Sequence, residues 1–343
     1  MVASLSIQSG ISVEIDCNCP LDRNGARYPA IQSPRPISRK FISRRSPPLL
    51  NSHLRSRPLV NMSSYDYIIV GGGTAGCLLA SRLANALPNK SILVLEAGKS
   101  HTNYPHVLIP GHYLQFLTSE DMSFTTVTVP QSHLNGRKIA IPRAKLVGGG
   151  SCANFMTWAR GPKCDWDEWA KRTGDNTYAW DNILPLLNDV LPIVEDWLMQ
   201  QLETFDGTIP SDMEKLAKPT KGAHGTKGPI GVGYGAEWMP LIDTYIEAAD
   251  EALKCGIIPD YNDGNVVGAS VAQFNIAGGE RITSPDAFLK TIPDNLTIWT
   301  EVEVNRITLQ RRKAVGVEIT KNGQTGTPLP IWGLIGRNNT LQR

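Results

Sequence analysis

The chain has 343 residues, of which 41% are hydrophobic and 19% are charged, and its formal net charge at pH 7 is +2. This length accommodates two globular domains, and the nearly balanced charge argues against a nucleic-acid-binding protein. No run of about 18 apolar residues occurs, so no membrane-spanning helix is expected.

Residues 1–62 form an extension that is rich in Arg, Ser and Pro. This composition predicts a disordered segment. Three interpretations stay open: an organelle transit peptide, a disordered regulatory arm, or untranslated sequence joined to the gene. The third is slightly favoured because residues 62–66, which begin with Met62, resemble a natural protein start directly before the first predicted strand. We therefore expect a cytoplasmic location, or a mitochondrial one if residues 1–61 are a transit peptide.

A strand, a glycine-rich turn and a helix are predicted in succession after this extension. Residues 67–70 form a short apolar run, and residues 77–84 have helical apolar spacing. Between them, Gly71, Gly73 and Gly76 fill the G-x-G-x-x-G pattern, which lets the backbone approach a pyrophosphate at a helix N-terminus. The turn, with Thr74 and Ala75 in it, is therefore a candidate dinucleotide site.

The next element supports this interpretation. Residues 91–95 read as a second buried strand that ends in Glu96, about 25 residues after Gly71, where an acid that binds the ribose is expected. An acid at this position favours a free 2′-hydroxyl group. The alternative is a glycine-rich turn in an ordinary α/β protein, with Glu96 as a solvated residue at the end of a strand.

A second glycine cluster, Gly148, Gly149 and Gly150 followed by Ser151, lies about 75 residues further on. Residues 141–154, with Trp158, Arg160 and residues 165–169, resemble the first signature of the glucose-methanol-choline (GMC) oxidoreductases. These are FAD-dependent flavoproteins that oxidise alcohols. The chain departs from the pattern at Gly150, where serine is common, and at Ala153, where a larger aliphatic residue is usual.

Other stretches extend the resemblance from about Tyr65 to Ile319. They are residues 129–131, 135–137, 178–185, 224–225, 228–230, 260–264, 281–289, 295–298, 304–307 and 314–318. The resemblance implies an α/β fold, in which a Rossmann-like FAD-binding domain is interleaved with an α+β substrate domain. The implied segments are 63–160 for the first part of the FAD domain, 161–290 for the substrate domain, 291–320 for strands that return to the FAD domain, and 321–343 for a divergent tail.

The same resemblance implies roles for individual residues. Gly71, Gly73, Gly76 and Glu96 are expected to hold the ADP half of FAD. Val304 is expected to offer backbone groups to the adenine. The residues expected along the diphosphate and the flavin are Arg143, Gly149, Ser151 and Asn154. An alternative for Arg143 is that it is a surface cation.

The implied reaction moves a hydride from the carbon of a small alcohol to the flavin while a base takes the hydroxyl proton. In the family that base is a histidine near the C-terminus. The last histidine here is His224, in a glycine-rich loop where the family commonly has a histidine that is not the base. We therefore assign no catalytic residue.

Residues 326–336 resemble a degraded form of the family's second signature, and Pro330 is expected to disrupt a helix or a central strand there. The sequence is therefore interpreted as a truncated family member that lacks the C-terminal part of the fold, with poor solubility or weak FAD retention. Two alternatives stay open: a non-catalytic flavin-binding remnant, and a NAD-dependent dehydrogenase that uses the first motif. The six cysteines show no zinc spacing and no disulfide framework, so no metal and mostly packed thiols are expected.

Overall fold

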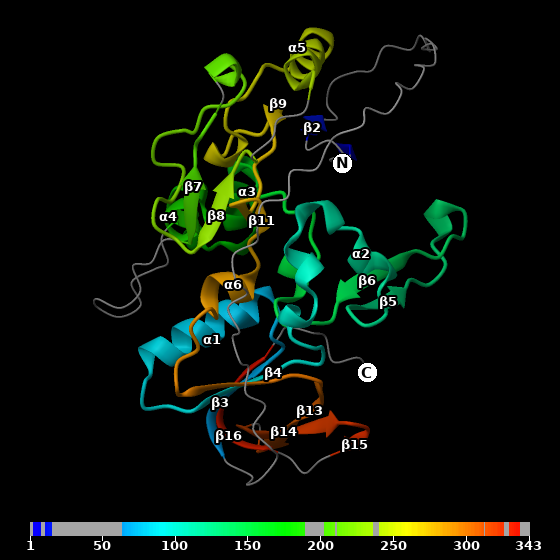
Figure 1. Ribbon diagram of the computed structural model, residues 1–343, viewed down its shortest axis with the longest axis vertical. Coiled ribbons are helices and arrows are strands. Elements are labelled where there is room, and N and C mark those ends of the chain that lie inside the picture. The colour runs from blue at the N-terminus through cyan, green and yellow to red at the C-terminus, as the bar shows by residue number, and fades with distance from the viewer. Residues whose placement is uncertain are drawn as a thin grey trace, which may run out of the picture.

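The computed structural model describes residues 3–7, 11–15, 64–188, 202–209, 211–235, 240–311, 313–325 and 329–336. In this part of the chain, no helix is both long and apolar enough to cross a membrane. The molecule is elongated, with a large sheet at one end and a mixed region of helices and short strands at the other (Figure 1).

The large sheet has the strand order β12-β4-β3-β16-β14-β13, and β15 pairs with β14. The first four strands of this order are parallel, whereas β16, β14 and β13 pair antiparallel. The strands are β3 (Tyr65–Val70), β4 (Ile92–Leu95), β12 (Leu296–Trp299), β13 (Val302–Gln310), β14 (Lys313–Lys321), β15 (Gln324–Thr325) and β16 (Leu329–Gly336). A parallel sheet flanked by a helix is the α/β architecture that the sequence predicts.

The period-two alternation of β3 and β4 places their side chains in two different cores. Ile69 and Val94 pack with helix α1 (Thr74–Ala86) on one face of the sheet. Ile68 and Leu93, which are directly paired in the parallel register, pack against residues of β13 and β14 on the other face. Because both faces are covered, these strands read as nearly continuous apolar runs in the sequence.

The second region is built from short elements around a separate core. Its helices are α3 (Lys163–Thr173), α4 (Trp180–Asn188) and α5 (Ile242–Leu253), and its strands are β7 (Glu203–Asp206), β8 (Ile230–Gly233), β9 (Gly268–Val271), β10 (Ile276–Ala277) and β11 (Glu280–Arg281). Leu216, Ile246 and Val271 lie in its apolar core. The mixture of helices and short strands agrees with the α+β character expected of a substrate domain, and the predicted segment boundaries stay predictions.

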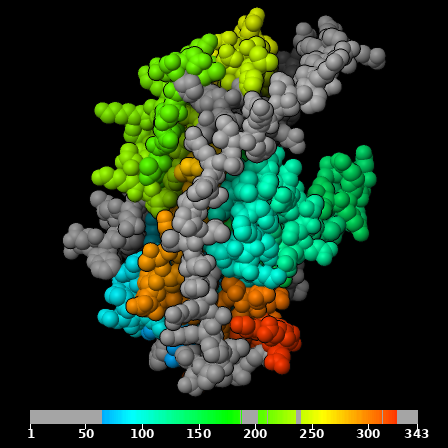
Figure 2. All heavy atoms as spheres, in the orientation of Figure 1, coloured from blue at the N-terminus to red at the C-terminus, as the bar shows by residue number. Residues whose placement is uncertain are grey.

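Three smaller elements lie outside these two groups of helices and strands. They are α2 (Gln115–Thr118), the hairpin of β5 (Ser123–Val127) and β6 (Ala140–Ala144), and α6 (Ser284–Phe288). The hairpin and the segment that joins its strands stand out from the body of the molecule (Figure 2). Helix α6 lies beside α1, next to the first glycine-rich turn (Figure 1).

The expectation that Pro330 disrupts a helix or a central strand was wrong. Pro330 is the second residue of β16, a central strand of the large sheet, and pairs with Gly316 of β14. The parallel pairing with β3 begins only at Ile331. A proline is tolerated close to the start of a strand because few ladder hydrogen bonds depend on its missing N–H there.

Two short segments of the predicted disordered extension are strands, β1 (Ala3–Ile7) and β2 (Ile11–Ile15). They pair antiparallel with each other, and β2 pairs with β9. Both segments alternate apolar and polar residues, a local pattern typical of strands that the composition of the whole extension conceals. The rest of residues 1–62 lies outside the described residues.

Candidate dinucleotide site

The two glycine-rich turns meet at the N-terminus of α1, in line with the family resemblance, which implies that both line one FAD molecule. The Gly148 amide donates a 2.7 Å hydrogen bond to the Gly72 carbonyl. Gly149 has φ +51° and lies so close to the first turn that a Cβ there would be 2.8 Å from the Gly73 Cα. Only glycine fits this contact, because a side chain would both strain the backbone and push the turns apart.

The first turn has the geometry that the G-x-G-x-x-G pattern requires. Gly71 has φ +95°, and its amide donates to the Leu95 carbonyl at the end of β4. A Cβ at Gly76 would lie 2.0 Å from the Gly71 carbonyl oxygen. Only glycine at position 76 therefore allows α1 to begin this close to the backbone of Gly71. Gly73 is the N-cap of α1 and provides no capping side chain, and no acidic residue lies in the first turn of the helix. Amide groups at such a helix N-terminus form a site for an anion.

Thr74, the first residue of α1, joins both turns. Its Oγ1 donates to the Gly148 carbonyl at 3.2 Å and accepts a hydrogen bond from the Ser151 amide at 3.1 Å. Ala75 follows it on the exposed side of the helix. The predicted residues Thr74, Gly149 and Ser151 are thus brought together.

A third segment, which sequence reasoning did not assign to the site, completes the junction. The Ser284 hydroxyl donates to the Thr74 carbonyl at 2.7 Å, and the Ser284 amide donates to the Ser151 hydroxyl at 2.9 Å. Ser284 begins α6, which Thr283 caps by accepting a hydrogen bond from the Asp286 amide. The capping pattern Thr-x-x-Asp was a local signal for this helix start, but nothing local shows that the helix docks on α1.

Glu96 is buried inside the first turn, with an exposed fraction of 8%. Its carboxylate accepts hydrogen bonds from the Gly72 amide at 2.8 Å and from the Gly98 amide at 2.9 Å. The alternative of a solvated acid at the end of a strand is therefore wrong. The Glu96 carbonyl also accepts from the Val302 amide, which places the start of β13 beside the turn, two residues before the half-buried Val304.

Asn154 and Arg143 differ in how they relate to the two turns. The Asn154 side-chain oxygen accepts hydrogen bonds from the Met156 amide and from Arg281, a residue that reaches the site from β11. Arg143 is exposed on β6, where its backbone pairs with Phe124. Its side chain makes no hydrogen bond or ion pair with a described residue of either glycine turn, so the geometry is that of a surface cation.

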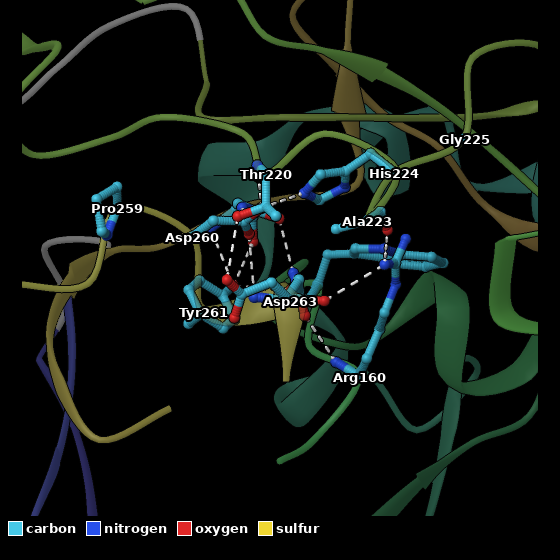
Figure 3. A network of polar contacts seen from close by, with 12 residues as sticks. Arg160, Thr220, Ala223, His224, Gly225, Pro259, Asp260, Tyr261 and Asp263 are labelled. Carbon is cyan, nitrogen blue, oxygen red and sulfur yellow. Dashed lines mark hydrogen bonds and ion pairs between the residues drawn. The ribbon is translucent and has the colours of Figure 1, made fainter. Parts of the chain in front are cut away.

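A second polar cluster lies in the other region, around His224 (Figure 3). The His224 ring stacks on Phe205, and its nitrogens lie 2.9 Å from Glu203 Oε1 and 2.9 Å from Asp260 Oδ2. Arg160 donates to the same Glu203 oxygen at 2.6 Å. All four charged side chains are almost completely buried.

Mutual neutralisation decides the charge states of this cluster. Burial alone would lower the pKa of His224, but the hydrogen bonds and charges of Asp260 and Glu203 outweigh it, so its pKa is raised. Burial would raise the pKa of each carboxyl, but for Glu203 the contacts with His224 and Arg160 prevail, and for Asp260 those with His224 and the Thr220 amide prevail, so both pKa values are lowered. Two cations and two anions thus form a neutral cluster, and a histidine with both nitrogens occupied in this way is poorly suited to act as a base.

The cysteines of the dinucleotide site are packed thiols. Cys77 and Cys152 are buried and free. Cys77 donates to the Gly72 carbonyl, and burial raises the pKa of its thiol to about 12. Burial raises the pKa of Cys152 as well, so both thiols are protonated near neutral pH and act as small apolar residues.

Comparison with known proteins agrees with this geometry. A family model described as GMC oxidoreductase matches residues 65–331. The chain is 34% identical over 245 residues to pyranose dehydrogenase 3 of Leucoagaricus meleagris, covering 71% of this chain and 38% of the relative. It is 33% identical over 261 residues to an alcohol dehydrogenase [acceptor] of Pseudomonas putida, covering 75% of this chain and 43% of the relative. The chain therefore spans about two fifths of the length of these curated relatives.

Solved structures show the same fold. The structure of pyridoxine 4-oxidase from Mesorbium loti aligns with a TM-score of 0.66 and 28% identity, over 80% of this chain and 49% of that one. A formate oxidase structure aligns with a TM-score of 0.63 and 26% identity, over 80% of this chain and 45% of that one.

Proposed function

The chain belongs to the GMC oxidoreductase family, and from that premise we propose that it binds FAD and contributes the dinucleotide site of an enzyme that oxidises a CH–OH group. The observation that carries this proposal is the contact of the two glycine turns at the N-terminus of α1. A backbone-lined cradle with an uncapped helix N-terminus suits a diphosphate, because amide groups approach its oxygens closely and the helix dipole favours negative charge.

The residues divide this task between them. The turn at Gly71, Gly73 and Gly76 would hold the diphosphate, and Glu96 would bind the ribose of the adenosine half. Ser151 and Asn154, on the second turn, would line the flavin. When bound, the flavin supplies the electron acceptor for a hydride, while the chain binds, orients and shields it.

The proposed substrate is a small hydroxylated molecule. The names of similar proteins include pyranose dehydrogenase, oxygen-dependent choline dehydrogenase and alcohol oxidase, all of which act on small molecules that carry a hydroxyl group. We assign no base, and His224 is not proposed for that role because two carboxylates enclose its ring nitrogens.

The experiment is a titration of the purified chain with FAD and, separately, with NAD⁺, followed by calorimetry and by visible absorbance. We expect saturable binding of about one FAD per chain, measured at equilibrium from the heat released and from the flavin absorbance bands. Preferential binding of NAD⁺, or no binding of FAD by a folded chain, would contradict the proposal.

A charge variant locates the site without disturbing the glycine contacts. Ala75→Glu puts a carboxylate on the exposed first turn of α1. The helix dipole stabilises a negative charge at this end of the helix, but the carboxylate repels a diphosphate. We expect at least tenfold weaker FAD binding with unchanged or slightly higher thermal stability. Asn89→Glu, which makes the same charge change in the exposed loop after α1, is the control and should bind FAD like the original chain.

A further inference from the structure

Two arginines are buried in the described part of the chain, and they differ in their partners. Arg160 forms an ion pair with Glu203 at 2.6 Å. Arg281 is 1% exposed and forms no ion pair with any described residue. Asp286, five residues further along the chain, pairs with His101 instead.

The contacts of Arg281 are all with neutral oxygen atoms. Its Nε donates to the Val107 carbonyl at 2.9 Å, and its Nη1 donates to the Asn154 carbonyl at 2.8 Å and to the Ser151 carbonyl at 3.3 Å. Nη1 also donates to the side-chain oxygen of Asn154. These contacts use the donors of Nε and Nη1, and no described residue provides a counter-charge for the guanidinium.

Such an arrangement is costly for a folded protein. A buried charge normally has a partner of opposite sign, because removal from water is repaid only by a close counter-ion and further hydrogen bonds. Burial lowers the pKa of the Arg281 guanidinium, yet an arginine keeps its proton in proteins. A charge retained under these conditions indicates a functional site, where a ligand completes the balance.

We propose that the counter-charge of Arg281 is the negative charge that the flavin gains on reduction, and that Arg281 positions Asn154 and the second glycine turn around that ring. This inference rests on the proposed function, because that proposal assigns Ser151 and Asn154 to the flavin and the first turn to the diphosphate. The diphosphate is a weaker candidate, since its expected place is the first turn, and none of the hydrogen bonds of Arg281 goes to that turn.

The charge balance of the reaction explains why such a cation is useful. The C–H bond of the alcohol breaks and its electron pair moves with the hydrogen to the flavin, while the O–H proton goes to a base and a carbonyl product remains. The flavin thereby gains two electrons and one proton, which is one net negative charge. A fixed positive charge in a dry site stabilises this product more than the neutral oxidised ring.

The experiment compares Arg281→Gln, which removes the charge but keeps amide donors, with Arg281→Lys, which keeps the charge. For each variant, the affinity for oxidised FAD is titrated, and the midpoint potential of the bound flavin is measured in equilibrium with a redox dye and dithionite. We expect Arg281→Gln to bind reduced flavin about tenfold more weakly relative to oxidised flavin, a potential lower by about 30 mV for a two-electron couple. Arg281→Lys should retain most of the original potential.

Asn154→Asp provides an independent variant in case neither change at Arg281 folds. It places a carboxylate next to Nη1 without touching Arg281, so it supplies the missing counter-charge. We expect the apoprotein to melt at a higher temperature and the bound flavin to have a lower potential. Leu216→Ala, a core change in the other region, is the control and should lower the melting temperature without moving the potential.

The outcomes separate the two proposals. If the unsubstituted chain does not bind FAD, the proposed function fails and this inference fails with it. If the chain binds FAD but Arg281→Gln and Arg281→Lys have equal potentials, or Asn154→Asp changes neither property, only the inference fails. Equal losses of affinity for oxidised and reduced FAD would assign the charge to the diphosphate and also overturn it.

Discussion

At the scale of single residues, His224 makes a pH-dependent contribution to stability. Its pKa is raised above the ordinary value of 6.5 by Glu203 and Asp260. A group whose pKa is raised on folding stabilises the protein fully below its unfolded pKa, and this contribution is lost as the pH rises through the folded pKa. The two carboxyls have lowered pKa values, so their contribution is lost only at acidic pH.

We therefore expect His224→Gln to be destabilised by about 3 kcal/mol or more at pH 6, because it leaves two buried carboxylates short of a cation. The difference from the original chain should shrink as the pH rises above 6.5 and the native imidazolium loses its proton. Urea unfolding at several pH values measures this difference. His133→Gln, an exposed histidine, is the control, and a difference that stays constant from pH 6 to pH 9 would contradict the assignment of charges.

The sequence predicted which residues form the glycine turns, because glycines that permit close contact occur in a recognisable local pattern, whereas their binding of FAD stays a prediction. Gly149 and Gly73 are examples, as is Glu96 at the end of a strand. The pairing of Arg281 with Asn154 and that of His224 with Asp260 could not be predicted. Each joins residues that are far apart in the chain, and neither side chain shows locally whether it will be buried or what it will contact.

At the scale of elements, the second glycine turn contains two adjacent glycines, of which one tolerates a side chain and the other does not. Gly149 has a positive φ and contacts the Gly73 backbone, whereas a Cβ at Gly150 would find only the Thr74 hydroxyl at 3.9 Å. We expect Gly149→Ala to separate the turns and to cost more than about 2 kcal/mol of stability, together with FAD binding. Thermal unfolding and FAD titration measure both effects.

Gly150→Ala is the matched control for this change. Its backbone does not need glycine, so the substitution should be neutral or stabilising by about 0.4–1 kcal/mol through the unfolded state. If both alanine variants behaved alike, the close contact between the turns would not determine the stability of the site.

Two serines, Ser151 and Ser284, hold α6 against the glycine turns, and each can be substituted separately. Ser151→Ala removes the hydroxyl that accepts a hydrogen bond from the Ser284 amide. The buried N–H then has no partner, which lowers the free energy of unfolding by about 1–3 kcal/mol. Ser284→Ala removes a hydroxyl together with its own hydrogen bond to Thr74, for which we expect about 1 kcal/mol. The midpoints of urea unfolding should therefore order the variants, with Ser151→Ala the less stable. The reverse order would show that α6 is held mainly by other contacts.

At the scale of the whole molecule, sequence and structure agree best where elements that follow one another in the chain also pack against one another. The succession of strand, turn, helix and strand from Tyr65 to Leu95 predicted the parallel core of the sheet. The position of β16 between β3 and β14 could not be predicted in this way, because Pro330 argues locally against a central strand. Pairing on both sides of β16 stabilises it despite that residue.

The projecting hairpin of β5 and β6, with the residues that adjoin its strands, carries exposed apolar side chains. Phe124, Val127 and Val129 are 46%, 60% and 74% exposed, and Ile139 across the hairpin is 42% exposed. Exposed apolar side chains gathered on a strand pair favour association between chains. We expect the purified chain to associate as its concentration rises, which light scattering coupled to gel filtration would measure.

Polar substitutions on the hairpin test whether this surface is the cause. Val127→Thr with Val129→Lys keeps the β propensity at position 127 and adds a charge at the most exposed of these positions, so the folded body should be unaffected. We expect the associated fraction to fall several-fold at equal concentration, with an unchanged melting temperature. Leu253→Lys, which adds a charge at an exposed position at the end of α5, is the control and should leave the association as it is. If the control reduced association as strongly as the hairpin variant, net charge would be the cause, because added charge keeps chains apart wherever it is placed.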